Sequence, residues 1–132
     1  MSRADTLRAL GESKRGTDPA GARAAYEEAV ALLRGSDDPL RFAHTLRHLG
    51  DVCHEQGDNA AAAPCYDEAL AVYRANAASA RPLDIANAIR SSAVLKQDPA
   101  LWAEALELYR AEGVEAGVAE CTRRLAILRG TP

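Results

Sequence analysis

Two histidines, His44 and His48, lie four residues apart in a segment with helical periodicity. Side chains at this spacing project from one face of a helix, which is the arrangement of a two-histidine metal half-site. His54 follows in the same segment on another side of the helix, and no acidic or cysteine ligand lies in register to complete the site. We therefore interpret His44 and His48 as polar residues in a binding groove or at its edge. A metal-binding protein that uses this pair is the remote alternative.

The sequence contains no recognisable catalytic motif. It has no phosphate-binding glycine loop, no G-x-S-x-G elbow, no H-E-x-x-H and no G-x-G-x-x-G. The three cysteines, Cys53, Cys65 and Cys121, are odd in number and form no C-x-x-C motif. We interpret them as reduced core or boundary residues of a cytoplasmic protein. Cys121 could alternatively be a reactive thiol, but the neighbouring Glu120 does not favour a thiolate, so we expect it to be inert. We therefore predict a non-enzymatic protein with no catalytic residue, no metal and no cofactor.

Four arginines share one position of a recurring helical pattern, namely Arg8, Arg47, Arg90 and Arg123. A guanidinium group can bind both oxygens of a carboxylate at once, so a series of them favours an acidic ligand. The alternative is a self-neutralised surface, because Glu12 and Asp51 stand four residues after the first two arginines. Val94 and Ile127 take that place after the other two. The sequence leaves both interpretations open.

The composition indicates one all-α domain. A chain of 132 residues fits a single domain, and the frequent Ala, Leu, Glu and Arg are strong helix formers. The net charge of −3 lacks the basic excess that is typical of nucleic-acid-binding proteins. No run of about 18 apolar residues occurs, and the first residues lack the apolar core of a signal peptide. We expect a protein or peptide partner, and neither nucleic acid nor membrane.

Asp-Pro pairs and glycines divide the chain into helices. Asp18-Pro19, Asp38-Pro39 and Asp98-Pro99 each place a capping side chain before a proline at the first helical position. Glycine closes helices in the left-handed conformation, which we expect at Gly16, Gly35, Gly57 and Gly113. Seven antiparallel helices are expected, at about 2–15, 19–34, 39–56, 59–77, 82–96, 99–112 and 115–129.

A pair of helices between residues 42 and 74 is the clearest copy of a repeated pattern. The first helix carries Leu49-Gly50, and the second carries Ala62, Tyr66 and Ala69 on one face. Small residues let the two helices cross closely, and the tyrosine ring fills the gap beside them. The pattern recurs about every 40 residues before and after this pair. One hairpin of this kind cannot bury its apolar side alone, so the copies should stack.

These residues resemble the tetratricopeptide repeat, whose marks are Leu-Gly in the first helix and small, aromatic and small residues in the second. The spacing is similar to that of the longer repeats in kinesin light chains and many bacterial proteins. The resemblance implies an all-α superhelical solenoid in one domain, with three helix hairpins at about 2–36, 38–78 and 82–113 and a capping helix at about 115–129. In the third copy Ser92 and Ala93 replace Leu-Gly. We expect a short first helix and a tight turn there.

In the resembled family, the first helices of the repeats line a concave groove that binds peptides. We expect the groove here to be lined by Asp5, Arg8, Glu12, His44, Arg47, Asp51, Asn87, Arg90 and Arg123. The predicted function is a non-enzymatic interaction scaffold that binds a protein or peptide segment, with an acidic segment favoured by the arginines. Glu12, Asp51 and His48 differ from the clamp of the chaperone-binding members, so we do not predict chaperone tails as ligands.

The last helix has two interpretations. Its polar residues Glu115, Glu120 and Arg123 favour a solubilising cap over the third repeat. Alternatively, the apolar Leu125, Ile127 and Leu128 of its second half mark a contact between two copies of the chain. The corresponding alternative function is a structural, self-associating module that forms a weak homodimer through its open repeat ends.

Overall fold

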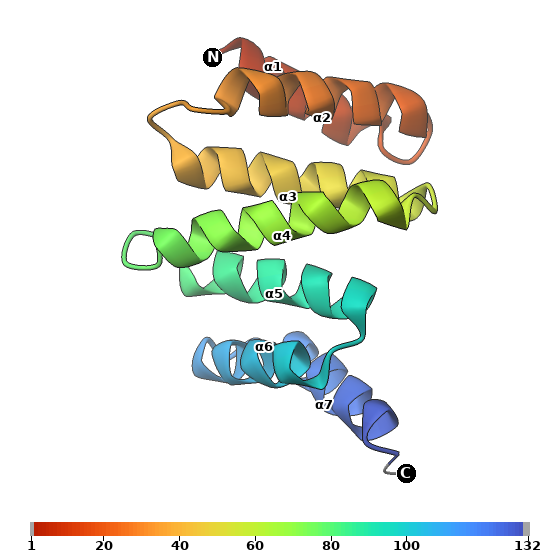
Figure 1. Ribbon diagram of the computed structural model, residues 1–132, viewed down its shortest axis with the longest axis vertical. Coiled ribbons are helices and arrows are strands. Elements are labelled where there is room, and N and C mark those ends of the chain that lie inside the picture. Colours follow the sequence, from red (N-terminus) through yellow and green to blue (C-terminus); the bar gives the residue numbers. More distant parts are fainter. Residues whose placement is uncertain (1, 131–132) are drawn as a thin grey trace. The chain divides into compact units, whose positions relative to one another are not determined.

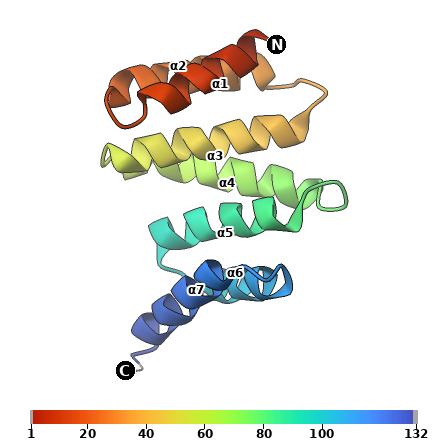
Figure 2. The same cartoon turned by 180° about the vertical axis from the view of Figure 1, so that it is seen from behind.

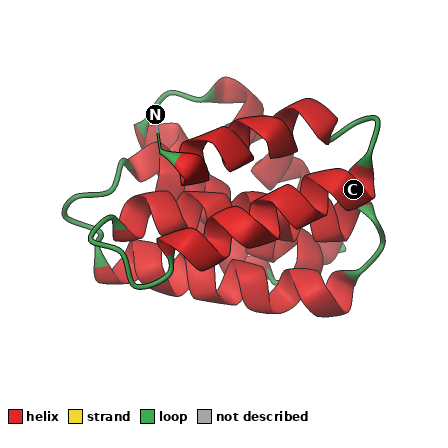
Figure 3. Ribbon diagram, turned by 90° about the horizontal axis from the view of Figure 1, so that it is seen from above, coloured by secondary structure: helices red, strands yellow, loops and turns green. Residues whose placement is uncertain are grey.

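The structure is a computed structural model that describes residues 2–130, which form seven helices and no strand (Figure 3). The helices are α1 (Arg3–Lys14), α2 (Pro19–Leu33), α3 (Pro39–Glu55), α4 (Asn59–Ala75), α5 (Pro82–Lys96), α6 (Pro99–Ala111) and α7 (Glu115–Leu128). Every expected helix is present, and its ends lie within two residues of the expected ones. The predicted all-α class is therefore confirmed. None of these helices is long and apolar enough to cross a membrane.

The chain divides into two compact units. Unit 1 is Met1–Asn76 and contains α1 to α4, while unit 2 is Ala77–Pro132 and contains α5 to α7. In unit 1, α1 packs on α2, α2 on α3 and α3 on α4, and consecutive helices run antiparallel (Figures 1 and 2). In unit 2, α5 packs on α6 and α6 on α7. Each unit is therefore built from helix hairpins of the expected kind.

The helix ends follow the capping chemistry of the sequence with one exception. Asp18, Asp38 and Asp98 each accept a hydrogen bond from a backbone N–H group of the helix that follows, and each precedes a proline at its start. Gly35, Gly57 and Gly113 have positive φ angles, as expected, but Gly16 does not. The expectation for Gly16 was wrong because the turn after α1 stays right-handed. The N–H groups of Thr17 and Asp18 reach the Lys14 carbonyl at 3.1 and 2.7 Å.

Glycine and tyrosine pack against each other in both hairpins of unit 1. A Cβ atom added to Gly50 would lie 2.7 Å from Cε1 of Tyr66, and one added to Gly11 would lie 2.8 Å from Cε2 of Tyr26. Both tyrosines are buried. The close crossing that the sequence indicates at Gly50 is therefore present, and it occurs in the first hairpin as well.

This crossing predicts the effect of Gly50→Ala. The new methyl group would meet both Tyr66 and the Cβ of Cys65, so overpacking should lower the free energy of unfolding by about 1–3 kcal/mol. Gly16→Ala is the matched control, because nothing lies within 4 Å of a Cβ at that position. Urea unfolding followed by circular dichroism measures both variants. Equal stability of Gly50→Ala and the wild type would contradict the close crossing.

The third hairpin differs as the sequence indicates. Its first helix, α5, has 15 residues against 17 in α3. Gln97, in the left-handed conformation at φ 53°, and Asp98 alone connect α5 to α6. Trp102 takes the place of the tyrosine and is fully buried, as is Ala93 at the glycine position.

Candidate functional site

An open pocket of about 490 Å³ lies on unit 1 between α1, α2 and α3. Its lining residues are Asp5, Arg8, Ala9, Glu12, Tyr26, His44 and His48. The pocket therefore brings together four of the nine residues that we expected to line a groove, namely Asp5, Arg8, Glu12 and His44.

Arg8 makes a different ion pair from the one that its sequence spacing suggested. Its Nη1 lies 3.5 Å from Oδ1 of Asp5, which also receives Nη1 of Arg41 at 3.2 Å. Glu12 instead accepts a hydrogen bond from the hydroxyl of Tyr26 at 3.1 Å. The pairing of Arg8 with Glu12, which the self-neutralised alternative offered, is replaced by the pair with Asp5, while Tyr26 of α2 donates to the Glu12 carboxylate. Hydrogen bonds from Ser2 and the nearby arginines lower the pKa of Asp5.

Asp51 joins α3, α4 and the turn after α1 through one carboxylate. It lies 3.3 Å from Nη1 of Arg47, as expected from the sequence, and accepts a hydrogen bond from the Tyr66 hydroxyl at 2.5 Å. Nη2 of Arg15 on the turn after α1 lies 3.7 Å away. The side chain of Arg47 is only 14% exposed, and its Nε makes no hydrogen bond among the described residues. This cluster therefore links α3 to α4 and to the turn after α1.

His44 and His48 line the unit 1 pocket and bind each other. Nε2 of His48 lies 3.1 Å from Nε2 of His44, and Nδ1 of His48 lies 3.2 Å from Nη1 of Arg15. A guanidinium can only donate, so Nδ1 of His48 accepts and its proton resides on Nε2, which donates to His44. Burial is the main cause that lowers the pKa of His48 to about 3, followed by electrostatic interactions with Arg47, His44, Arg15 and Arg8. His48 is therefore neutral at physiological pH.

The described residues contain no cluster of three or more His, Cys, Asp or Glu side chains that could hold a metal ion. The three cysteines are free thiols, two of them buried. Burial raises the pKa of Cys53 and Cys121, and it raises that of Cys65 to about 11. All three thiols are therefore protonated near neutral pH, and a protonated thiol is a poor nucleophile.

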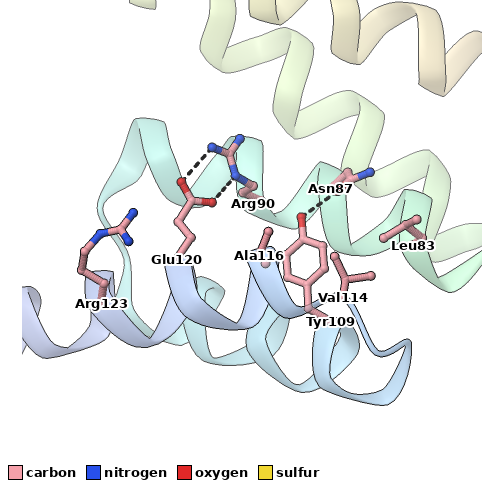
Figure 4. A pocket seen from close by; sticks show the side chains of 9 residues that line it. Leu83, Asn87, Arg90, Tyr109, Val114, Ala116, Glu120 and Arg123 are labelled. Carbon is pink, nitrogen blue, oxygen red and sulfur yellow. Dashed lines mark hydrogen bonds and ion pairs between the residues drawn. The ribbon is translucent and has the colours of Figure 1, made fainter.

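A second open pocket, of about 630 Å³, lies within unit 2 (Figure 4). Its lining residues come from α5, α6, α7 and the turn before α7, and they are Leu83, Asn87, Arg90, Tyr109, Val114, Ala116, Gly117, Glu120 and Arg123. It contains Asn87, Arg90 and Arg123, which are the remaining expected groove residues other than Arg47 and Asp51. We call this pocket the unit 2 groove.

The polar side chains of the unit 2 groove are partly satisfied from within (Figure 4). Arg90 makes a bidentate ion pair with Glu120 of α7, with Nη2 2.8 Å from Oε2. The hydroxyl of Tyr109 donates to Oδ1 of Asn87 at 2.6 Å. The amide nitrogen of Asn87 and the exposed guanidinium of Arg123 make no hydrogen bond within residues 2–130. These two groups are donors that a ligand can use.

The charges of the two pockets differ in sign. In the unit 1 pocket Arg8 stands against Asp5 and Glu12, while the histidine pair adds no charge at His48. In the unit 2 groove two arginines stand against one glutamate. Its hydrogen bonds to Arg90 lower the pKa of Glu120, so that carboxyl stays ionised and paired. The lining side chains therefore give the unit 2 groove a net positive charge and the unit 1 pocket a net negative charge.

Sequence reasoning missed several residues that shape these sites. Arg15 makes a bidentate ion pair with Glu55, at 2.7 Å for Nη2, and also contacts His48 and Asp51. It lies just beyond α1, where no repeat position marks it. Glu120 was noted only as a capping residue, because its partner Arg90 is distant in sequence. The tyrosine–carboxylate bonds had a signal: an acid follows the glycine in both α1 and α3, and a tyrosine recurs in the next helix.

Comparison with known families connects this geometry to a class of proteins. Residues 2–75, more than half of the chain, match the family model of the tetratricopeptide repeat. A search of curated proteins finds no match. The matched segment contains both glycine–tyrosine hairpins of unit 1. The chain therefore belongs to the tetratricopeptide repeat family, whose repeats generally mediate protein–protein interactions and are typically not catalytic.

Proposed function

We propose that the chain is a protein-interaction module whose unit 2 groove binds a carboxylate-bearing peptide segment of a partner protein. The observation that carries the proposal is the pair of donors in that groove, the amide nitrogen of Asn87 and the guanidinium of Arg123, which have no hydrogen-bond partner within the described chain. A carboxylate from an acidic side chain or a chain end is the group that the guanidinium of Arg123 recognises, and the amide nitrogen of Asn87, on the other side of the Arg90–Glu120 pair, offers a second donor to the peptide (Figure 4).

The surroundings of these donors suit a peptide. Leu83 and Val114 offer apolar contact at one end of the groove, where the Leu83 side chain is exposed. The Arg90–Glu120 pair separates this end from Arg123 (Figure 4). An apolar residue of the peptide would pack on Leu83 and Val114, while its carboxylate would lie near Arg123. Other peptide-binding domains also recognise acidic motifs through basic side chains.

The wider arginine series contributes less directly to this proposal. Arg8, Arg47 and Arg90 each have an acidic partner within the chain, at Asp5, Asp51 and Glu120. These pairs support a role in fixing the walls of the two pockets. A single ladder through all four arginines stays a prediction. The free thiols favour a reducing compartment, and we propose the cytoplasm.

Arg123→Glu tests the proposed function. Because it replaces the free cation of the groove by an anion, affinity for an acidic peptide should fall about tenfold or more. An array of immobilised acidic decapeptides, with neutral and basic peptides of equal length, supplies the ligand, and its best binder is then measured by titration calorimetry.

Arg129→Glu is the control, since it changes the net charge equally on an exposed turn after α7, outside the lining of the groove. It should bind like the wild type. Equal losses in both variants would indicate non-specific charge attraction, and an unchanged affinity of Arg123→Glu would refute the groove assignment.

A further inference from the structure

The helix α7 occupies the position of a first helix of a fourth repeat. In unit 1 the Tyr26 ring of α2 stacks on His48 of the following helix, with centroids 6.0 Å apart. In unit 2 the Trp102 ring of α6 faces Arg124 of the following helix, with the guanidinium 5.7 Å from the ring. His48 and Arg124 stand directly after Arg47 and Arg123, the equivalent arginines. The helix α7 therefore packs on α6 in the register in which α3 packs on α2.

The second helix of this fourth repeat is missing among residues 2–130, where α7 is the last helix (Figure 1). Side chains of α7 that such a helix would cover are exposed, whereas the equivalent side chains of α1, α3 and α5 are buried. Ala4, Ala43 and Ala86 are buried by their hairpin partners, but the equivalent Ala119 is exposed. Likewise Leu7, Leu46 and Ile89 are buried, but the equivalent Thr122 is exposed. Ile127 is 65% exposed, which is the highest value among the exposed large apolar side chains of the described residues.

We call the side of α7 formed by the exposed Ala119, Thr122 and Ile127 and the half-buried Ala126 the outer face of α7. It borders an open pocket of about 290 Å³, whose lining includes Ala126 and Thr122 together with Leu106 and Arg110 of α6. This pocket shares no residue with the unit 2 groove. The face is therefore a separate surface.

The three complete hairpins show which side chains of a second helix pack on such a face. Each second helix carries an aromatic residue followed two positions later by Glu and three positions later by Ala, at Tyr26, Tyr66 and Trp102. In unit 1 the ring packs on the glycine of the first helix. Its hydroxyl bonds the acid that follows that glycine, Glu12 or Asp51. In unit 2 the equivalent pair is Ala93-Val94, and the ring is Trp102, whose buried Nε1–H finds no hydrogen-bond partner among the described residues.

On α7 the equivalent pair is Ala126-Ile127, which again offers no acceptor. Phe has no polar atom and leaves no unpaired buried group at this pair, while Trp102 shows that a tryptophan is accommodated at the equivalent pair of α5. The ligand helix is therefore expected to resemble α6 more than α2 or α4.

Charge complementarity fixes a second feature of the ligand. Arg34, the residue directly after α2, makes a bidentate ion pair with Glu68 of the next second helix, α4, at 2.7 and 3.1 Å. Arg110 of α6 is the equivalent of Arg34 and borders the outer face of α7. Its present partner is Glu107 on its own helix, and both side chains are more than half exposed. Exposed pairs of this kind contribute little, so Arg110 can bind an incoming glutamate instead.

We propose that the outer face of α7 binds an amphipathic helix of a partner protein that carries Phe or Trp, then Glu two positions later and a small residue three positions later. A second copy of this chain fits less well. Its own helices with this pattern already bury their rings, as Tyr26, Tyr66 and Trp102 are at most 3% exposed. A copy could donate such a helix only by opening one of its hairpins.

A peptide with the sequence of residues 98–112, acetylated, amidated and labelled with fluorescein, is the probe, because it contains Trp102, Glu104 and Ala105 in the required pattern. Fluorescence anisotropy with the full chain should show saturable binding below about 1 mM. Ala126→Arg, which fills the ring position, should weaken binding about tenfold or more. Ala100→Arg, exposed at the start of α6, is the control and should bind normally.

Exchanging the two charges tests whether Arg110 of the protein contacts Glu104 of the peptide. Arg110→Glu in the protein should weaken binding about tenfold, and Glu104→Lys in the peptide should restore it with that variant only. A peptide with Trp102→Ala, which lacks the ring, should bind more weakly than the original.

Absence of saturable binding, or binding unaffected by Ala126→Arg, would overturn the proposal. If the chain forms dimers in sedimentation that Ile127→Asp abolishes and the peptide does not displace, the occupant is a second copy and the proposal of a partner helix is wrong. None of these outcomes depends on Arg123, so they are separate from the test of the proposed function.

Discussion

Asp51→Ala should lower the free energy of unfolding by about 3 kcal/mol. The carboxylate of Asp51 is 18% exposed and serves Arg47, Arg15 and the Tyr66 hydroxyl together. Its removal leaves Arg47, which already has a buried and unbonded Nε, as a poorly compensated charge beside a buried hydroxyl. Removal of one partner from a buried ion pair typically costs about 3–5 kcal/mol, and the partial exposure places this case at the lower end.

Glu12→Ala is the matched control for Asp51→Ala. Both acids follow the glycine of a first helix and accept a hydrogen bond from the tyrosine of the next helix. The Glu12 side chain is 67% exposed, however, and water replaces its contacts. We expect a loss of about 0.5–1 kcal/mol for Glu12→Ala. Urea unfolding at pH 7 measures both variants, and similar losses for the two would refute the central role of Asp51 in unit 1.

The stability of the chain should fall on mild acidification because of His48. The pKa of His48 is lowered from 6.5 to about 3 in the folded chain, chiefly by burial and then by Arg47 and His44. Between these values the unfolded chain binds a proton that the folded chain does not. The free energy of unfolding therefore rises with pH in this window, by up to about 1.4 kcal/mol per pH unit. The contribution is complete above pH 6.5 and is lost as the pH falls towards 3.

The charged groups around His48 support a lowered pKa and therefore a loss of stability at low pH. Arg8 of α1, Arg15 of the following turn and Arg47 of α3 oppose a positive charge on the ring. Asp51 of α3 favours one, but its nearest oxygen lies 3.9 Å from Nδ1 and is shared with Arg47. The hydrogen bond from Arg15 also requires an unprotonated Nδ1. A charged His48 would have to give up that bond.

His48→Gln tests this pH dependence, because the amide oxygen can still accept from Arg15. Between pH 6 and pH 4 the wild type should lose about 2 kcal/mol more stability than the variant. Unfolding in urea at several pH values gives the difference, in which the carboxyl groups common to both proteins cancel. Proton NMR of the His48 ring should show no titration above about pH 4. A ring that titrates near pH 6.5 would contradict the buried, neutral pair.

The helices could be predicted from the sequence because their signals are local. Asp18, Asp38 and Asp98 cap the helices that follow, and the spacing of small and aromatic residues gives the hairpins. Gly16 shows the limit of this reasoning, because a glycine permits the left-handed conformation without requiring it. Hydrogen bonds from two following residues to Lys14 decided the turn instead.

The candidate sites were only partly predictable because their contacts join distant segments. Asn87 and Arg123 were identified from the repeat register, and the structure places both in the unit 2 groove. The partner of Arg90 lies 30 residues away at Glu120. Glu12, which one alternative offered as the partner of Arg8, accepts a hydrogen bond from Tyr26 instead. Register gives the side of a helix that a residue occupies. It does not show which of several nearby acids an arginine will bind.

The most direct test of the proposed function is an NMR titration that observes the groove donors themselves. The side-chain amide of Asn87 and the Nε–H of Arg123 are followed while the best acidic peptide from the array is added to the full chain. We expect both signals to shift with the same saturation curve, and the signals of Arg8 and His44 in the unit 1 pocket to stay in place. A peptide that saturates the chain while Asn87 and Arg123 do not shift would contradict carboxylate binding in the unit 2 groove.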